Sequence, residues 1–181
     1  ITPAVRGTLT HKVLELIPFD EMLDETKVRE FVESLPEKGF MSAREAEAVD
    51  CRKVAAFFKS DTGRRLRDAQ WIRREWPFTL RKSRDEIAAM AANDDIKEEM
   101  RSSLAENVLI QGIIDCCFRD DRGIVVVDYK TDWVDRKNKD SEIARLREEY
   151  RRQLELYSEV IERSLGERPE SVVLFLLDSG D

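Results

Sequence analysis

Apolar and polar positions alternate most regularly near the middle of the chain. Two runs of strand length, Val108–Phe118 and Ile124–Asp132, are rich in β-branched residues, and this composition predicts β-strands. Turn-forming residues fill the stretch Arg119–Gly123 between them, so the pattern predicts a hairpin. A further strand is predicted for Trp71–Leu80, where Pro77 favours a sheet edge or a bulge.

Helical periodicity dominates the last third of the chain. A long helix is predicted from Ser141 until the stop signals Gly166 and Pro169. Its apolar face consists of Ile143, Leu146, Tyr150, Leu154, Tyr157, Ile161 and Leu165. A buried strand, Val172–Leu177, follows, and the long helix lets it return parallel to a strand of the hairpin.

The first part of the chain is predicted to form a scaffold of helices. Helices are predicted for Gly7–Ile17, ended by Pro18, and for Asp24–Leu35. The capping box that Ser42 begins predicts one further helix that continues through Phe58. The sequence Ser60-Asp61-Thr62-Gly63 then predicts a break, followed by a short basic stretch.

Residues Ser83–Ala105 are acidic and only weakly periodic, which predicts an excursion with some helix between the first strand and the hairpin. The whole order predicts an α/β fold: a mixed sheet of three antiparallel strands, plus a strand that returns after a helix, flanked by helices. We expect one domain over 1–181, with a helical part, 1–68, and a core, 69–181. Because the chain begins with Ile1, we also expect a piece of a longer protein.

Composition narrows the classes of function. A net charge of −7 with 38% charged residues argues against a protein that coats nucleic acid by electrostatics alone. Three cysteines make neither a disulfide framework nor a four-thiolate metal site. No apolar stretch approaches the length of a membrane span, so we expect a soluble, cytoplasmic protein.

Charged residues interrupt the apolar hairpin at three positions. Asp115 lies within the first strand, while Asp128 and Lys130 close the second. Pairing across the turn can bring the two carboxylates side by side, with Lys130 on the same face as Asp128. Such a set can hold a hard divalent cation and direct a water toward a phosphate. The alternative is a salt bridge at the end of a strand.

Other candidate residues leave their roles open. His11, the only histidine, shares a helix face with Gly7 and is either a ligand or a core or capping residue. Glu75 is either a partner of a neighbouring arginine or a third acid. Gln153 and Tyr157 lie one turn apart, and the amide of Gln153 either completes a buried polar network or reaches into the site.

Five motifs occur in the order typical of one nuclease family: Gly7-Thr8-x-x-His11, Glu75 before Pro77-Phe78, Gln111-Gly112-x-Ile114-Asp115, Asp128-Tyr129-Lys130-Thr131-Asp132 and Gln153-x-x-x-Tyr157. In these motifs the chain resembles the RecB-like branch of the PD-(D/E)XK nucleases. Within that branch it is most similar to the C-terminal nuclease domains of bacterial AddA-type helicase–nucleases.

The resemblance implies a role for each matching residue. It implies that a divalent metal, Mg²⁺ with Mn²⁺ as a substitute, is held by His11, Asp115, Asp128 and the main-chain carbonyl of Tyr129. Lys130 would position or activate the attacking water. Gln153 and Tyr157 would support the site and contact DNA, and Glu75 would be an acid of less certain role. No iron–sulfur cluster is expected, because the four cysteines of AddB-like relatives are missing.

The implied function is a metal-dependent DNA exo- or endonuclease that cuts a strand delivered by an attached helicase, in double-strand-break repair by homologous recombination. The implied partners are DNA, helicase domains of the same polypeptide and a second, AddB-like subunit. Two alternatives stay open: a free-standing RecB-family exonuclease, and a catalytically inactive module that binds DNA or a partner.

Overall fold

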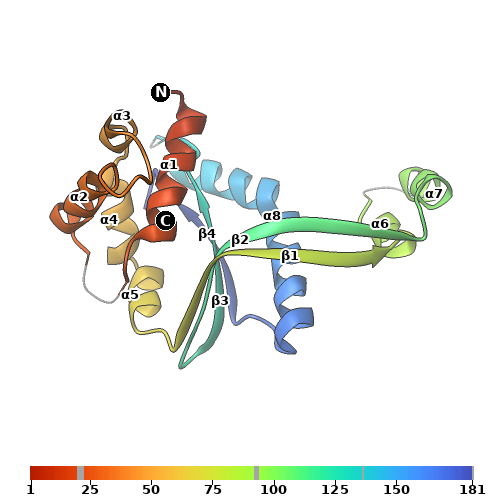
Figure 1. Ribbon diagram of the computed structural model, residues 1–181. Coiled ribbons are helices and arrows are strands. Elements are labelled where there is room, and N and C mark those ends of the chain that lie inside the picture. The colour runs from red at the N-terminus through yellow and green to blue at the C-terminus, as the bar shows by residue number, and fades with distance from the viewer. Residues whose placement is uncertain (20–22, 92–93, 136, 181) are drawn as a thin grey trace. The chain divides into compact units, whose positions relative to one another are not determined.

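A computed structural model describes residues 1–19, 23–91, 94–135 and 137–180. The described segments contain a four-stranded sheet with strand order β1-β2-β3-β4 (Figure 1). The elements in chain order are α1 (Pro3–Leu16), α2 (Glu25–Ser34), α3 (Ala43–Glu47), α4 (Cys51–Lys59), α5 (Asp61–Arg67), β1 (Trp71–Ser83), α6 (Arg84–Ala89), α7 (Asp94–Ser103), β2 (Asn107–Asp120), β3 (Gly123–Lys130), α8 (Lys139–Leu165) and β4 (Ser171–Leu176).

The hairpin and the returning strand form as predicted. Strands β2 and β3 pair antiparallel, from Asp120 opposite Gly123 to Cys116 opposite Val127. Strand β4 pairs parallel with β3, and β1 runs beside β2 in the opposite direction (Figure 1). The predicted mixed sheet and the α/β class are therefore confirmed.

The chain divides into two compact units, and the boundary falls within β1 and β2. The larger unit contains Ile1–Trp76 and the chain from Ile114 onward, and the smaller one is Pro77–Ile113. The smaller unit contains the predicted excursion, with the short helices α6 and α7. A backbone hydrogen bond of 3.1 Å, from Arg84 N to Glu106 O, closes this excursion. The single domain over 1–181 stays a prediction.

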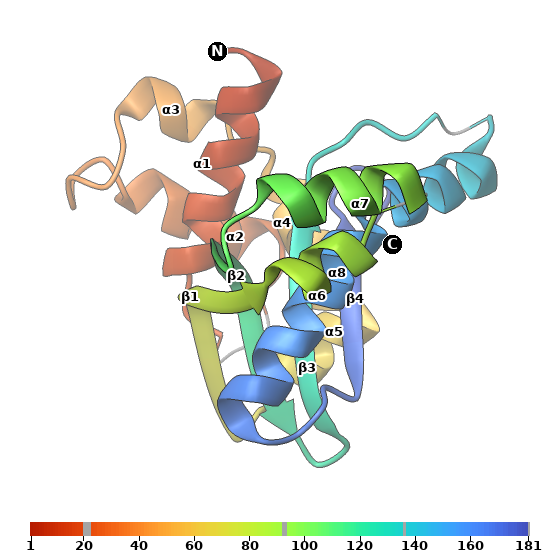
Figure 2. The same cartoon turned by 90° about the vertical axis from the view of Figure 1, so that its right-hand side faces the viewer.

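Alternate residues of β3 face two different layers of helices. Val125, Val127 and Tyr129 join the apolar cluster built with the N-terminal helices. Asp128 and Lys130 therefore point to the opposite face, which α8 covers as it crosses β3 and β4 (Figure 2). The sheet is thus the middle layer of the larger unit, and the predicted site residues of β3 lie on the α8 face.

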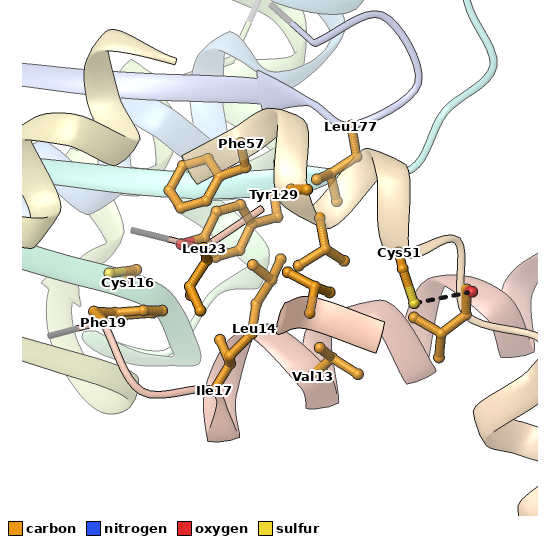
Figure 3. Packing of buried hydrophobic residues seen from close by; sticks show 14 of the residues in the cluster. Val13, Leu14, Ile17, Phe19, Leu23, Cys51, Phe57, Cys116, Tyr129 and Leu177 are labelled. Atoms are coloured by element: carbon orange, nitrogen blue, oxygen red, sulfur yellow. Dashed lines mark hydrogen bonds between the residues drawn. The ribbon is translucent and has the colours of Figure 1, made fainter. Parts of the chain in front are cut away.

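Aromatic rings fill the centre of the cluster on the other face. The Phe57 ring packs edge-on against Tyr129 and Phe175, with centroid distances of 5.0 and 4.9 Å. Leu14 of α1 and Ile17, directly after its end, converge on the same cluster (Figure 3). Because burial of large side chains is the main favourable contribution to folding, this cluster fixes α1 against the sheet.

Two of the predicted N-terminal helices are confirmed with small shifts. Helix α2 begins after Asp24, whose side chain accepts a hydrogen bond from Lys27 N. Helix α1 begins four residues before the predicted start at Gly7, because Thr2 caps it and Pro3 occupies its first position. At the other end of the chain, Gly166 ends α8 in the left-handed conformation, with φ +72°.

One local prediction is wrong, and two others differ from the structure in part. The helix predicted from Ser42 through Phe58 is two helices, α3 and α4, because Asp50 caps a new start by accepting from Arg52 N. The predicted break is present at Ser60, where α4 ends, but Ser60 also caps a short helix, α5, that the sequence does not predict. Leu165, the last residue of the predicted apolar face of α8, is 38% exposed.

Two further properties of the described chain are the state of its three thiols and the apolar length of its helices. Cys51, Cys116 and Cys117 are all buried and unpaired, and burial raises the pKa of Cys116 and Cys117 to about 12. In the described segments no helix combines the length and the apolar character needed to cross a bilayer.

The turn between β2 and β3 is held by one buried carboxylate. Asp120 accepts hydrogen bonds from the backbone N–H groups of Arg122 and Gly123. The guanidinium of Arg65 binds both carboxylate oxygens, at 2.6 and 3.1 Å. These contacts, the Arg65 hydrogen bond first, lower the pKa of Asp120 to about 2.

We expect Asp120→Asn to lower the free energy of unfolding by about 2 kcal/mol at pH 7, because charge-assisted hydrogen bonds are lost. A depressed pKa stabilises the fold above the ordinary value of 3.8 and ceases to do so as pH falls toward 2. The difference between wild type and variant should therefore be constant from pH 7 to about 5 and shrink below it. Urea unfolding across this range tests it, with exposed Asp121→Asn as the control. An unchanged difference at pH 3 would contradict it.

Candidate metal centre

Close packing of α1 on the end of β3 brings the only histidine to the site. A Cβ atom added at Gly7 would lie 2.8 Å from the hydroxyl oxygen of Thr131, so glycine permits this approach. One turn later, His11 Nδ1 lies 3.5 Å from Asp115 Oδ1. The His11 ring is 30% exposed and contacts the edge of the core at the Tyr129 ring. His11 thus lies beside an acid, at the margin of the core.

Asp115 lies just past the end of the paired part of the hairpin. The register ends with Cys116 opposite Val127, so Asp115 and Asp128 are the next residues on the two strands, as the spacing predicts. Asp115 Oδ2 accepts a hydrogen bond of 2.8 Å from Tyr129 N. This contact fixes one carboxylate oxygen and leaves the other, Oδ1, toward His11.

The main chain of Tyr129 faces the β2 side of β3, where Asp115 lies. The carbonyl of Lys130 accepts from Leu177 N on the β4 side, and successive carbonyls of a strand point to opposite sides. The N–H of Tyr129 points to Asp115, so its carbonyl also points to the β2 side. The Tyr129 ring meanwhile lies in the core, 3% exposed, which leaves only its backbone at the site.

Asp128 and Lys130 form a buried ion pair on the α8 face. Lys130 Nζ lies 2.7 Å from Asp128 Oδ2, and the Asp128 side chain is 1% exposed. Burial raises the pKa of Asp128, although the ammonium of Lys130 opposes the shift. Apart from the ammonium of Lys130, Oδ2 has no hydrogen-bond partner among the described residues, so this buried carboxylate oxygen can still accept one more contact. Lys130 Nζ also lies 4.5 Å from the centre of the Tyr150 ring.

Glu75 joins the site from β1. One side-chain ligand atom each from His11, Glu75 and Asp115 lies within 4.8 Å of the other two. Glu75 therefore lies beside the other two side chains, and which of its two roles it has stays a prediction. Its φ of +46° is the only positive value at a non-glycine residue in the described part of the chain, a conformation that costs about 1–3 kcal/mol and is typical of functional sites.

The charges of this group change the pKa values of its members. Burial alone lowers the pKa of His11, but the carboxylate of Asp115 and the charges of Glu75 and Asp128 raise it overall. Burial and the charge of Asp115 raise the pKa of Glu75. The acids therefore repel one another in a partly buried place, and a bound cation would relieve that repulsion.

Helix α8 contributes the last two predicted residues. Gln153 Nε2 donates a hydrogen bond of 2.7 Å to the hydroxyl of Tyr157, and Tyr157 is 5% exposed. Burial and the charge of Asp128 raise the pKa of Tyr157 to about 12. Gln153 is thus hydrogen-bonded to a tyrosine whose pKa responds to the charge of Asp128.

Arg74 is a residue that the sequence does not indicate as part of this arrangement. Its guanidinium donates to the carbonyls of Leu14, Glu15 and Ile17 at the end of α1 and stacks 3.9 Å from the centre of the Phe19 ring. Arg74 thereby ties the helix of His11 to the strand of Glu75. No local pattern marks this role, because its partners are backbone atoms about sixty residues earlier in the chain.

The structure therefore brings the predicted residues into two adjoining sets. His11, Glu75 and Asp115 form the compact group, whereas Asp128 and Lys130 pair beside it. Carboxylate and carbonyl oxygens with one imidazole are the donors that Mg²⁺ or Mn²⁺ accept. The donor set and the buried acceptor on Asp128 fit a hard divalent cation.

Comparison with known proteins gives one family and many relatives. The model of the PD-(D/E)XK nuclease superfamily matches residues 1–180. The chain is 37% identical over 180 residues to an ATP-dependent helicase/nuclease subunit of Desulforudis audaxviator, a match that covers 99% of this chain. It is 38% identical over 166 residues, 90% of this chain, to the protein of the same name from Geobacillus thermodenitrificans. These matches cover only 14% and 13% of the relatives' own lengths.

Proposed function

The chain belongs to the PD-(D/E)XK nuclease superfamily, and from this premise we propose that it hydrolyses phosphodiester bonds of DNA with the help of a divalent metal ion. The observation that carries the proposal is the group of ligand atoms from His11, Glu75 and Asp115 within 4.8 Å of one another. The ion pair of Lys130 with Asp128 beside that group supplies the second half of the site.

We propose that His11, Asp115, Asp128 and the carbonyl of Tyr129 hold the ion. Mg²⁺ is the proposed ion, and Mn²⁺ is the expected substitute because an imidazole is among the donors. When bound, it would neutralise phosphate oxygens and lower the pKa of water. Glu75 is proposed as a further acid that either binds the ion or orients water. We expect no iron–sulfur cluster in this chain.

The protein's own residues supply the rest of the chemistry. The ammonium of Lys130, held by Asp128, positions the attacking water and offsets the negative charge that develops on the phosphate. Gln153 holds the Tyr157 hydroxyl by a hydrogen bond, and we propose that this pair supports the site and contacts the DNA backbone. The backbone N–H of Tyr129 fixes Asp115, so the carboxylate needs little reorganisation.

The wider role is proposed from the relatives. Their name is that of an ATP-dependent helicase/nuclease subunit, and we propose that this chain likewise works beside helicase domains of one polypeptide. A second, AddB-like subunit, recombinational repair of double-strand breaks as the setting and a cytoplasmic location are further proposals. The net charge of −7 is consistent with a strand delivered by a motor.

Two other functions compete with this one. A free-standing exonuclease would need no delivered strand and should cut free DNA ends rapidly by itself. An inactive module would bind DNA or a partner without cutting. The presence of Asp115, Asp128 and Lys130 favours an active enzyme over the inactive module, since loss of any of them would remove part of the chemistry.

We expect the chain to cleave labelled single-stranded DNA only with Mg²⁺ or Mn²⁺, and Asp115→Asn to abolish this cleavage because the compact group loses a charge. Calorimetry with Mn²⁺ should give binding to wild type and binding at least about tenfold weaker for the variant, as loss of a ligand predicts. Asp121→Asn, an exposed acid, is the matched control. A wild type that neither binds Mn²⁺ nor cuts DNA would favour the inactive module.

A further inference from the structure

The most exposed large apolar side chain follows the site closely in the chain. Trp133 is 71% exposed, the highest value among the large hydrophobic residues in the described segments. Leaving an indole in water forgoes about 2 kcal/mol of burial energy. A single exposed ring is common on protein surfaces, but one that follows a candidate site in the chain offers a flat apolar face on which a ligand can stack.

The backbone around Trp133 is anchored on both sides. The carboxylate of Asp132 accepts a hydrogen bond of 3.2 Å from the Tyr150 hydroxyl. Val134 is 1% exposed, and its N–H donates to Asp178 Oδ2 at 3.1 Å. Lys53 Nζ in turn lies 2.6 Å from the other oxygen of Asp178. The backbone on both sides of the exposed ring is therefore fixed, so binding a ligand on the ring would cost little further conformational entropy.

Trp133 lies close to the two halves of the site. It follows Lys130 by three residues, so their Cα atoms are at most about 10 Å apart. Tyr150 contacts both the ammonium of Lys130 and the carboxylate of Asp132. Thr131, between them, packs on Gly7 one turn before His11. A nucleotide bound at the acids would have its neighbour within reach of the indole.

We propose that Trp133 stacks on a base of single-stranded DNA next to the phosphodiester that is cut, so that the site prefers an unpaired strand to a duplex. The proposal rests on the proposed nuclease function and adds to it a residue that contacts the substrate. Only an unpaired base can offer its face to a side chain, and such stacking tolerates any sequence. It also gives an acidic chain a contact with DNA that does not depend on net charge.

The test measures DNA binding without cleavage. Wild type, Trp133→Ala and Trp133→Phe are titrated with a short fluorescent single strand in EDTA, and then with the same sequence as a duplex. We expect Trp133→Ala to bind the single strand about tenfold or more weakly and Trp133→Phe to retain most of the affinity. Duplex binding should not change. Phe40→Ala, which also removes an exposed ring, should bind like wild type.

Abasic nucleotides locate the stacked base. A single abasic site at one position should weaken wild type as much as Trp133→Ala does, and it should not weaken Trp133→Ala further. Equal single-strand binding by wild type and Trp133→Ala overturns the proposal, as does a wild type that does not bind single strands. Loss of duplex and single-strand binding alike would also overturn it, and would indicate a packing role or a protein partner for the indole.

The two proposals can fail separately. If the chain binds single strands through Trp133 but never cuts them with metal, the nuclease function fails and the stacking contact stands. If Trp133→Ala cuts subsaturating single strands as fast as wild type, the stacking proposal fails and the nuclease function stands.

Discussion

Lys130→Met should reduce metal-dependent cleavage of single-stranded DNA by about 10²- to 10⁴-fold, the range measured for loss of a catalytic proton-transfer or charge-stabilising group. Methionine keeps the unbranched stem and removes the ammonium that lies 2.7 Å from Asp128 Oδ2. Single-turnover rates at saturating DNA measure the effect on the chemical step, since binding no longer limits them.

Two further measurements separate catalysis from folding in this variant. Loss of the ammonium leaves Asp128 buried without its partner, so we expect a lower free energy of unfolding as well. The far-ultraviolet circular dichroism spectrum should nevertheless match wild type, and Mn²⁺ should still bind, because the proposed ligands remain. A variant that is folded and binds Mn²⁺, but cuts at the wild-type rate, would refute the role of Lys130.

Gly63→Ala should destabilise the fold by about 3 kcal/mol, although alanine normally stabilises a helix relative to glycine. Gly63 lies in the first turn of α5, where α4 has just ended. A Cβ atom there would lie 2.1 Å from the carbonyl oxygen of Phe57 and 2.6 Å from the Cα of Phe58. Both neighbours are backbone atoms, and Phe57 is fixed in the aromatic cluster, so the collision cannot be relieved by a rotamer change.

Thermal unfolding measures this effect, with an expected fall in melting temperature of about 6–12 °C for a chain of this size. Gly39→Ala is the matched control: at Gly39, φ is +77° and nothing lies within 4 Å of an added Cβ atom. That substitution should cost only about 1 kcal/mol of backbone strain. A Gly63→Ala variant as stable as wild type would contradict the close approach of α4 and α5.

The sequence predicts the elements whose burial pattern is simple. Strand β3 is buried at six consecutive positions, and a continuous β-branched run of that length has few other interpretations. The break between α3 and α4 is not predicted because apolar residues continue across it, while the interruption depends on one cap, Asp50. Helix α5 is not predicted because its seven residues, mostly basic or polar, carry no periodic signal.

The candidate site is predictable as far as strand register determines it. The hairpin spacing places Asp115 near Asp128 and puts Lys130 on the Asp128 face, in agreement with the observed pairing and ion pair. The positions of His11 and Glu75 depend instead on how α1 and β1 pack. Arg74 ties α1 to β1, and Glu75 has a positive φ; neither feature has a local sequence pattern. The functional roles of all these residues remain predictions.

The parallel pairing of β3 with β4 has a consequence for synthesis on the ribosome. Strand β3 ends at Lys130, and its partner β4 begins only at Ser171. At a synthesis rate of about 5–20 residues per second, the β4 side of β3 therefore stays unpaired for about 2–8 s. During that time the hairpin presents a nascent apolar strand with unpaired backbone groups, which is the template that aggregation uses. Helix α8, which emerges in between, is rich in charged residues, and charged residues that flank an apolar strand oppose aggregation.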